Sequence, residues 1–283
     1  MAFNRIAVWG HRGFVGSAVV TALIASGAPV TILHRPGSDT SHLPYHVKKI
    51  EVDDLDEDAL VAALQDIDIV ISLVGDAGTA SQYGFVKAIP RTKVQLFSPS
   101  DCCLRYGEQG MRIPCMKAKA DLEKAANDAG IPVTVVHQGN FAEYTFNTLT
   151  KDYVAAAFVD IFAARPISTI QNRTITLSEL TPTGLEIAAV MKKKHGSDPT
   201  TETRSLEDVN RTIEGYISNG SNLAVPSYCR KIWGTGEMIK MLPDELWEVE
   251  GYKKATLEDI ILEGECGNYR ALPETVVEYL RKL

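Results

Sequence analysis

The chain has 283 residues, of which 45% are hydrophobic and 23% charged, proportions ordinary for a globular protein with a sizeable core. A formal net charge of −7 argues against a nucleic-acid-binding protein, which would need a basic surface. No apolar run approaches the length of a membrane span, no signal peptide precedes the first expected strand, and the five irregularly spaced cysteines suggest neither disulfides nor zinc. We therefore expect a cytoplasmic protein without membrane, nucleic-acid or metal partners.

The N-terminus carries the most informative motif. An apolar run, residues 6–9, leads into Gly-x-x-Gly-x-x-Gly with glycines at positions 10, 13 and 16, and then into a run with helical spacing. Strand, glycine loop and helix in this order are typical of the first unit of a dinucleotide-binding fold. A purely structural glycine turn is the alternative.

Each glycine of the loop has a physical reason. Gly10 allows a sharp turn off the strand, Gly13 lets a pyrophosphate approach the backbone, and Gly16 lets the helix pack closely. The first residues of the helix, Phe14 and Val15 with Gly16, would present unpaired N–H groups to the phosphates.

The end of the second expected strand, residues 28–33, indicates the cofactor. NAD sites place an acid here for the ribose 2′-hydroxyl, whereas NADP sites place an arginine for the 2′-phosphate. This chain has Arg35, with no acid near it in the sequence and with Ser38 shortly after, and Arg12 in the glycine loop can reach the same phosphate. We therefore expect NADP(H), unless both arginines are merely solvated surface residues.

Four further strands are expected at residues 47–52, 67–74, 93–97 and 131–136, alternating with helices near 56–65, 85–89 and 116–129. The fold class is therefore α/β, a Rossmann-type doubly wound parallel sheet. Ligands of such sheets bind at the carboxyl ends of the strands. The candidate residues on that edge, besides the glycine loop and Arg35, are Gly75, Ser98, Pro99, Ser100, His137, Asn140 and Phe141.

The second half is less regular, and we expect residues 1–150 to form the NADP-binding domain and 151–283 a smaller, mainly helical substrate lobe. Helices are expected at 146–164, at 181–195 with Thr181 as N-cap, from a Ser205 cap onward, and at 237–242, 256–262 and 273–283. A short strand is expected at 174–177, and the pattern leaves open whether strands of this half rejoin the main sheet.

Several motifs together resemble the NmrA-like, isoflavone reductase-like branch of the atypical short-chain dehydrogenases. They are the glycine loop, Arg35, Phe-Ser-Pro-Ser-Asp at 97–101, Lys-x-Lys at 117–119 and Gly-Ile-Pro-Val-Thr at 130–134. The resemblance covers roughly residues 5–145 and implies a Rossmann domain with a small substrate lobe that binds NADPH. In catalytic members, a lysine on the helix before the sixth strand contacts the nicotinamide ribose and the substrate, and that lysine is similar in position to Lys119.

Two positions depart from the family pattern. Arg12 stands where members usually have Thr, which leaves the glycines intact. Cys115 stands where ordinary short-chain dehydrogenases have the tyrosine that donates a proton, so this donor is absent here. Lys119 and His137 remain as candidate catalytic residues. A solvated helix lysine, with Lys117 and Lys124 as competitors, and a hydrogen-bonded core histidine are the alternatives.

Three functional classes are consistent with these residues. The first is an NADPH-dependent reductase of a small aromatic or conjugated metabolite, in which Lys119 would stabilise developing negative charge. The second is a non-catalytic NADP(H)-sensing regulator like the family's namesake, and the third is a cofactor-assisted isomerase or cyclase on the same scaffold. The sequence leaves the substrate and the oligomeric state, a homodimer included, open.

Overall fold

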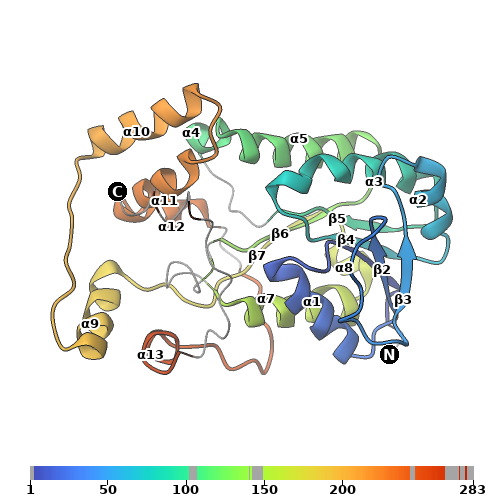
Figure 1. The fold of residues 1–283 in the computed structure, drawn as a ribbon, viewed down its shortest axis with the longest axis horizontal. Helices are drawn as coiled ribbons and strands as arrows, with labels where there is room; N and C mark the ends of the chain where they lie inside the picture. Colours follow the sequence, from blue (N-terminus) through green and yellow to red (C-terminus); the bar gives the residue numbers. More distant parts are fainter. Residues whose placement is uncertain are drawn as a thin grey trace.

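The computed structural model describes residues 3–101, 107–139, 141, 149–242 and 246–264, with the single residues 274 and 278. Five parallel strands form the main sheet in the order β3-β2-β1-β4-β5, which is the expected doubly wound arrangement (Figure 1). The strands are β1 (Ile6–Trp9), β2 (Val30–His34), β3 (Lys48–Glu51), β4 (Ile69–Ser72) and β5 (Leu96–Ser98).

The sixth expected strand, β6 (Thr134–His137), pairs in parallel with β7 (Arg173–Thr176). A single parallel bridge between Phe97 and Val133 connects this pair to the edge of the main sheet. The strand expected at 174–177 therefore lies beside β6, and the chain beyond residue 150 returns to the layer of the first half. The division at residue 150 stays a prediction.

Two cores cover the two faces of the sheet, because successive strand residues point in opposite directions. Val8 belongs to the core beneath α1 (Phe14–Ala25) and α7 (Lys151–Phe158), whereas its neighbours Ala7 and Trp9 belong to the core on the opposite face. The second face is covered by α2 (Glu57–Ala63), α3 (Gln82–Ala88) and α5 (Pro114–Asp128), as Figure 1 shows. Nearly all-apolar strands such as β4 are buried on both sides.

The remaining helices lie mostly at the other end of the molecule (Figure 1). One cluster joins the start of α5 to the helices that follow residue 205, and another joins α9 (Gly184–His195) to α13 (Leu257–Ile261). The other helical segments are η1 (Asp76–Ser81), η2 (Ile89–Arg91), α4 (Glu108–Met111), η3 (Val159–Ala164), α8 (Ile167–Ile170), α10 (Leu206–Ser218), α11 (Ala224–Gly234) and α12 (Glu237–Met241).

The helix expected after a Thr181 cap begins two residues later than predicted. Thr183, and not Thr181, is the N-cap of α9, and Glu186 completes a capping box by accepting from the Thr183 N–H. The Ser205 cap of α10 is confirmed, since its hydroxyl accepts from the Asp208 N–H. The helix expected at 273–283 and the first residues of the one expected at 146–164 lie outside the described elements.

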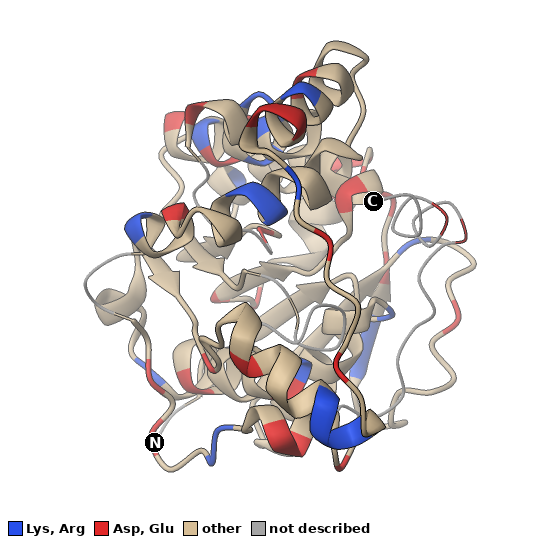
Figure 2. Ribbon diagram, turned by 90° about the vertical axis from the view of Figure 1, so that its left-hand side faces the viewer, with Lys and Arg blue, Asp and Glu red and all other residues tan. Residues whose placement is uncertain are grey.

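Charges of both signs are mixed over the helical end of the molecule. Figure 2 shows Lys and Arg segments interspersed with Asp and Glu on this face. The basic last turn of α9, Lys192 to His195, complements the negative end of its own helix dipole. None of the described helices is long and apolar enough to cross a bilayer.

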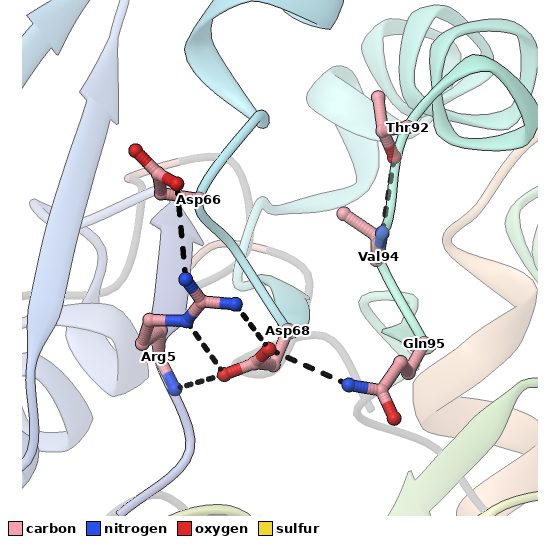
Figure 3. A network of polar contacts seen from close by, with 6 residues as sticks. All are labelled: Arg5, Asp66, Asp68, Thr92, Val94 and Gln95. Atoms are coloured by element: carbon pink, nitrogen blue, oxygen red, sulfur yellow. Dashed lines mark hydrogen bonds and ion pairs between the residues drawn. The ribbon is translucent and has the colours of Figure 1, made fainter.

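An ion pair connects neighbouring strands of the sheet at their amino ends. These ends lie opposite the edge at which a ligand is expected. The guanidinium of Arg5 donates to both carboxylate oxygens of Asp68, at 3.0 and 2.7 Å, and the Arg5 N–H donates to the same carboxylate at 2.9 Å (Figure 3). Gln95, just before β5, also donates to Asp68. Arg5 precedes β1 and Asp68 precedes β4, so this network holds three neighbouring strands together.

Candidate functional site

A groove of about 250 Å³ opens at the carboxyl ends of β1, β2 and β4. The expected residues Gly10, Arg12, Gly13, Arg35, Ser38 and Gly75 line it, as the strand-edge rule predicts. Its other lining residues were not singled out from the sequence; they are Trp9, His11, Leu33, His34, Leu73, Val74 and Gly78.

The glycine loop is a cradle that side chains would fill. Gly10 has a φ of +102°, and a Cβ there would lie 2.7 Å from the backbone of Leu73. A Cβ on Gly16 would lie 2.0 Å from the carbonyl oxygen of Gly10, so the helix packs directly on its own loop. A Cβ on Gly13, by contrast, would meet protein atoms no nearer than 3.6 Å. The protein alone therefore has room for a side chain at Gly13. A phosphate bound in the loop would leave no room for it.

The first turn of α1 faces this loop without a side-chain cap. Its N-cap is Gly13, which has no side chain to bond the N–H groups of the first turn. Phe14 lies edge-on against Phe141 with ring centroids 5.5 Å apart, and the Lys151 ammonium lies 5.6 Å from the Phe14 ring centre. Phe14 and Phe141, two expected residues that are far apart in the sequence, thus meet beside the loop.

Arg35 is held in place by two neighbours at the mouth of the groove. Its Nε donates to Asp54 Oδ1 at 2.9 Å, and its guanidinium lies over the Trp9 ring at 5.5 Å. The sequence places no acid beside Arg35 at the end of β2, but in the folded chain Asp54 approaches it from the segment after β3. The bond to Asp54 uses only the N–H on Nε, which is one of the five N–H donors of the guanidinium.

Three histidines, His11, His34 and His42, lie close to one another near Arg12. The buried His11 ring stacks on His42 with centroids 5.4 Å apart and lies edge-on to His34. Burial lowers the pKa of His11, and the neighbouring His42, Arg12 and His34 charges lower it further. The lowered pKa favours the neutral His11 ring, so Arg12 and Arg35, rather than this histidine, supply the positive charge at this end of the groove.

Lys119 lies in the second turn of α5 and is only 9% exposed. Its Nζ lies 3.0 Å from Oδ1 of Asp76, the residue after Gly75. Cys115, one turn earlier, is buried, and this burial, followed by the charge of Asp76, raises its pKa to about 11. Lys119 is therefore a buried, paired lysine, unlike Lys117 and Lys124, which are exposed and pair with acids on the same helix.

The ends of β5 and β6 hold further polar contacts. The His137 ring nitrogen Nε2 lies 3.7 Å from Asp101 Oδ2, and His137 is buried. The Ser100 hydroxyl donates to the Val74 carbonyl at 2.6 Å, and the Ser100 N–H donates to the buried side chain of Gln82. Ser98 and Pro99 are buried as well, and Asn140 lies outside the described residues.

Within the described ranges, no group of three or more His, Cys, Asp and Glu side chains could hold a metal ion. The geometry fits a dinucleotide instead. The Cβ-free cradle and uncapped helix start suit a pyrophosphate, and Arg35 with Arg12 suits a further phosphate at the adenosine end.

Comparison with known proteins decides the family. The profile of the NmrA-like family matches residues 3–155, which is more than half of the chain. The chain belongs to the NmrA-like family. The residues matched include the whole glycine loop, Arg35, Asp54, Asp76 and Lys119.

Curated relatives of this NmrA-like chain include plant reductases. A phenylcoumaran benzylic ether reductase of Pyrus communis, Pyrc5, is 30% identical over 169 residues, 54% of either chain. An isoflavone reductase homologue of Zea mays is 30% identical over 154 residues, 50% of either chain. The chain thus spans about half the length of the curated relatives it matches.

Solved structures show the same fold over nearly the whole chain. The complex of leucoanthocyanidin reductase from Vitis vinifera with NADPH has a TM-score of 0.72 at 20% identity and covers 92% of this chain and 98% of that one. A crystal structure of isoflavone reductase gives the same TM-score and identity and covers 92% of this chain and 99% of that one. The Rossmann-like fold with its C-terminal helices is therefore shared.

The ion pairs that three acids form at this site were not predicted from the sequence. Asp54, Asp76 and Asp101 pair with Arg35, Lys119 and His137 respectively. Each acid follows the carboxyl end of one of the parallel strands β3, β4 and β5, and this position was the available signal. Its partner, however, comes from another segment, so no local spacing pattern reveals the pairs.

Proposed function

We propose that this chain is an NADPH-dependent reductase of a small aromatic or conjugated metabolite. The observation that carries the proposal is the joint presence, on one sheet edge, of a phosphate cradle and a buried lysine. The cradle is the loop from Gly10 to Gly16, and the lysine is Lys119, paired with Asp76. A protein that only sensed the dinucleotide would have no need for a buried ammonium paired with Asp76, the residue after the groove-lining Gly75.

NADPH is the proposed cofactor. The first-turn N–H groups of α1, from Phe14 to Gly16, would bind its pyrophosphate, and Arg35 with Arg12 and Ser38 would bind the 2′-phosphate. The remaining candidate contacts, to the other half of the cofactor, are Gly75, Ser98, Pro99, Ser100, Lys119, Asn140 and Phe141. When bound, NADPH supplies a hydride.

The protein groups would handle charge and protons. Lys119, as an ammonium, would stabilise the negative charge that develops on an acceptor oxygen or conjugated carbon and then release a proton to it. His137, beside Asp101, is the second candidate for proton transfer. Cys115 is unsuited to this task, because its buried thiol packs in the cluster with α10 and α11.

The substrate class is taken from relatives. The names of the matching plant proteins include phenylcoumaran benzylic ether reductases, an isoflavone reductase homologue and eugenol synthase 1 of Petunia hybrida. An aromatic or conjugated acceptor is therefore proposed, and Phe141, packed on Phe14, is the aromatic wall that supports it. The helices beyond residue 151 are proposed as the lobe that selects the acceptor.

The test combines binding with turnover. Fluorescence titration of the purified protein should show saturable NADPH binding, tighter than NADH binding, and a panel of conjugated aromatic acceptors should then be screened by the loss of NADPH absorbance. Turnover of a panel member supports the reductase. Tight NADPH binding without turnover of any acceptor favours the sensor, and conversion of substrate without net NADPH loss favours an isomerase or cyclase.

A cytoplasmic location is part of the proposal. The free thiols of Cys115 and Cys229 suit a reducing cytoplasm. Size-exclusion chromatography with light scattering would decide between a monomer and the homodimer that the sequence leaves open.

A further inference from the structure

The Lys119–Asp76 pair differs from the other lysine pairs of the described chain in where its cation lies. Lys119 is 9% exposed, whereas the lysines of the other described ion pairs are at least 35% exposed. Asp76 is 50% exposed. The ammonium is therefore the buried partner, and the carboxylate is the partner in contact with solvent.

A buried ammonium loses much of its hydration, and this cost favours the neutral amine unless an opposite charge is close. Asp76 supplies that charge at 3.0 Å. The backbone around Asp76 is itself fixed: it follows Gly75, which lines the groove, and begins η1, where the Gly78 N–H donates to the Gly75 carbonyl. The carboxylate is thus held at the edge of the groove.

Three charged groups on the described elements around α5 have partners other than Lys119. Asp101 faces His137, Arg112 at the C-cap of α4 binds Glu214, and Lys87 of α3 binds Glu57. On α5 itself, Cys115 lies one turn before Lys119. Burial raises the pKa of this thiol, and the charges of Asp76 and Lys119 act on it in opposite directions, which places both near it.

We propose that Asp76 is the positioning residue that keeps Lys119 protonated and directed at the reacting edge of the groove, so that Lys119 acts as an acid. This inference rests on the proposed reductase function. In each turnover, one N–H bond of the ammonium breaks as the reduced acceptor takes the proton. The neutral amine then regains a proton from water by way of the half-exposed carboxylate of Asp76.

The direct test measures protonation without turnover. Protein with isotope-labelled lysine is titrated by NMR in the absence of cofactor, and the Lys119 signal is assigned by its loss in Lys119→Arg. In Asp76→Asn, the midpoint of the Lys119 titration should fall by about one pH unit or more, because the buried cation has lost its counter-charge. Asp76→Glu should restore most of the shift.

Asp121→Asn is the matched control, because Asp121 pairs with the exposed Lys117 on the same helix. It should leave the Lys119 midpoint unchanged. If Asp76→Asn does not fold, Asp76→Ser serves as the second variant. An Asp76→Asn midpoint equal to that of the wild type overturns the inference, whatever the activity.

Turnover supplies the second readout once an acceptor is known. The alkaline limb of kcat should move to lower pH in Asp76→Asn by the same amount as the NMR midpoint, with KM for NADPH unchanged. A limb that stays in place while the NMR midpoint moves overturns the acid role of Lys119. If the NMR midpoint moves but no acceptor is found, the pairing stands and the reductase function fails, so the two failures are distinguishable.

Discussion

Asp54 accepts a hydrogen bond from Nε of Arg35 at 2.9 Å, across the mouth of the groove. The acid is 14% exposed and the arginine 53% exposed, so the less exposed partner orients the more exposed one. The Arg35 guanidinium also stacks over the Trp9 ring, 5.5 Å from its centre. An arginine fixed in this way loses less side-chain entropy when a phosphate binds, which is a form of preorganisation.

Replacing Arg35 by Ala tests the choice of cofactor. Loss of a charge-assisted bond to the 2′-phosphate costs about 1.5–3 kcal/mol, so the affinity for NADPH should fall roughly 10- to 100-fold. NADH lacks this phosphate, and its affinity should change little. Calorimetric titration measures both, and Arg91→Ala is the control, because Arg91 is a half-exposed arginine paired with Asp58 outside the groove. Equal losses for NADPH and NADH would remove Arg35 from phosphate recognition.

Two glycines of the loop should respond differently to substitution. Gly13→Val should fold, because Gly13 has an ordinary φ of −67° and room for a Cβ, but it should lose NADPH binding. Gly16→Ala should be strongly destabilised, because its Cβ would lie 2.0 Å from the Gly10 carbonyl oxygen. Thermal melts and fluorescence titration separate the two effects. Full NADPH affinity in folded Gly13→Val would show that the loop serves only the fold.

The ion pair between Arg5 and Asp68 should make the stability of the fold depend on pH. Bonding to Arg5 holds the pKa of Asp68 below its ordinary value, so the pair stabilises the fold above the unfolded-state pKa of about 3.9 and this contribution is lost as the pH falls through the folded-state pKa. Asp68→Asn should therefore lower Tm at pH 7 and converge with the wild type in strong acid. Asp66→Asn is the control, since Asp66 is exposed and lies 3.8 Å from Arg5. A constant difference in Tm at every pH would contradict this assignment.

Cys115 should be chemically inert in the folded protein. Its pKa of about 11 leaves little thiolate at pH 8, so alkylation by iodoacetamide should be roughly 100-fold slower or more than in the unfolded chain. Reactivity should rise as the pH approaches 11. Mass spectrometry of tryptic peptides locates the modification, and rapid labelling of native Cys115 at pH 8 would show that the thiol is ionised.

Local patterns in the sequence predicted the sheet and the groove but not the ion pairs. Gly10, Gly13 and Arg35 were placed correctly on the groove because each follows a strand whose apolar run is unmistakable. Asp54 was missed because it lies nineteen residues beyond Arg35 and reaches it only when β2 and β3 pair. Such contacts depend on strand register and on the packing of neighbouring segments.

The error at the start of α9 has a local cause. Thr181 and Thr183 both precede helical sequence, and Pro182 favours the first helical position after Thr181. Glu186 decides between them, because only Thr183 stands three residues before it and can form the capping box. The pair of Thr183 and Glu186, three residues apart, is thus the sequence signal that marks the start of this helix.

Single-turnover oxidation of bound NADPH by conjugated aromatic acceptors is the most direct measurement of the proposed reductase. Lys119→Met should slow it about a hundredfold or more, because a charge-stabilising proton donor is lost, while NADPH affinity falls only modestly. Lys117→Met, on the exposed face of the same helix, should behave as the wild type. Unchanged oxidation in Lys119→Met, or none in the wild type across a broad panel, would contradict a reductase that works through Lys119.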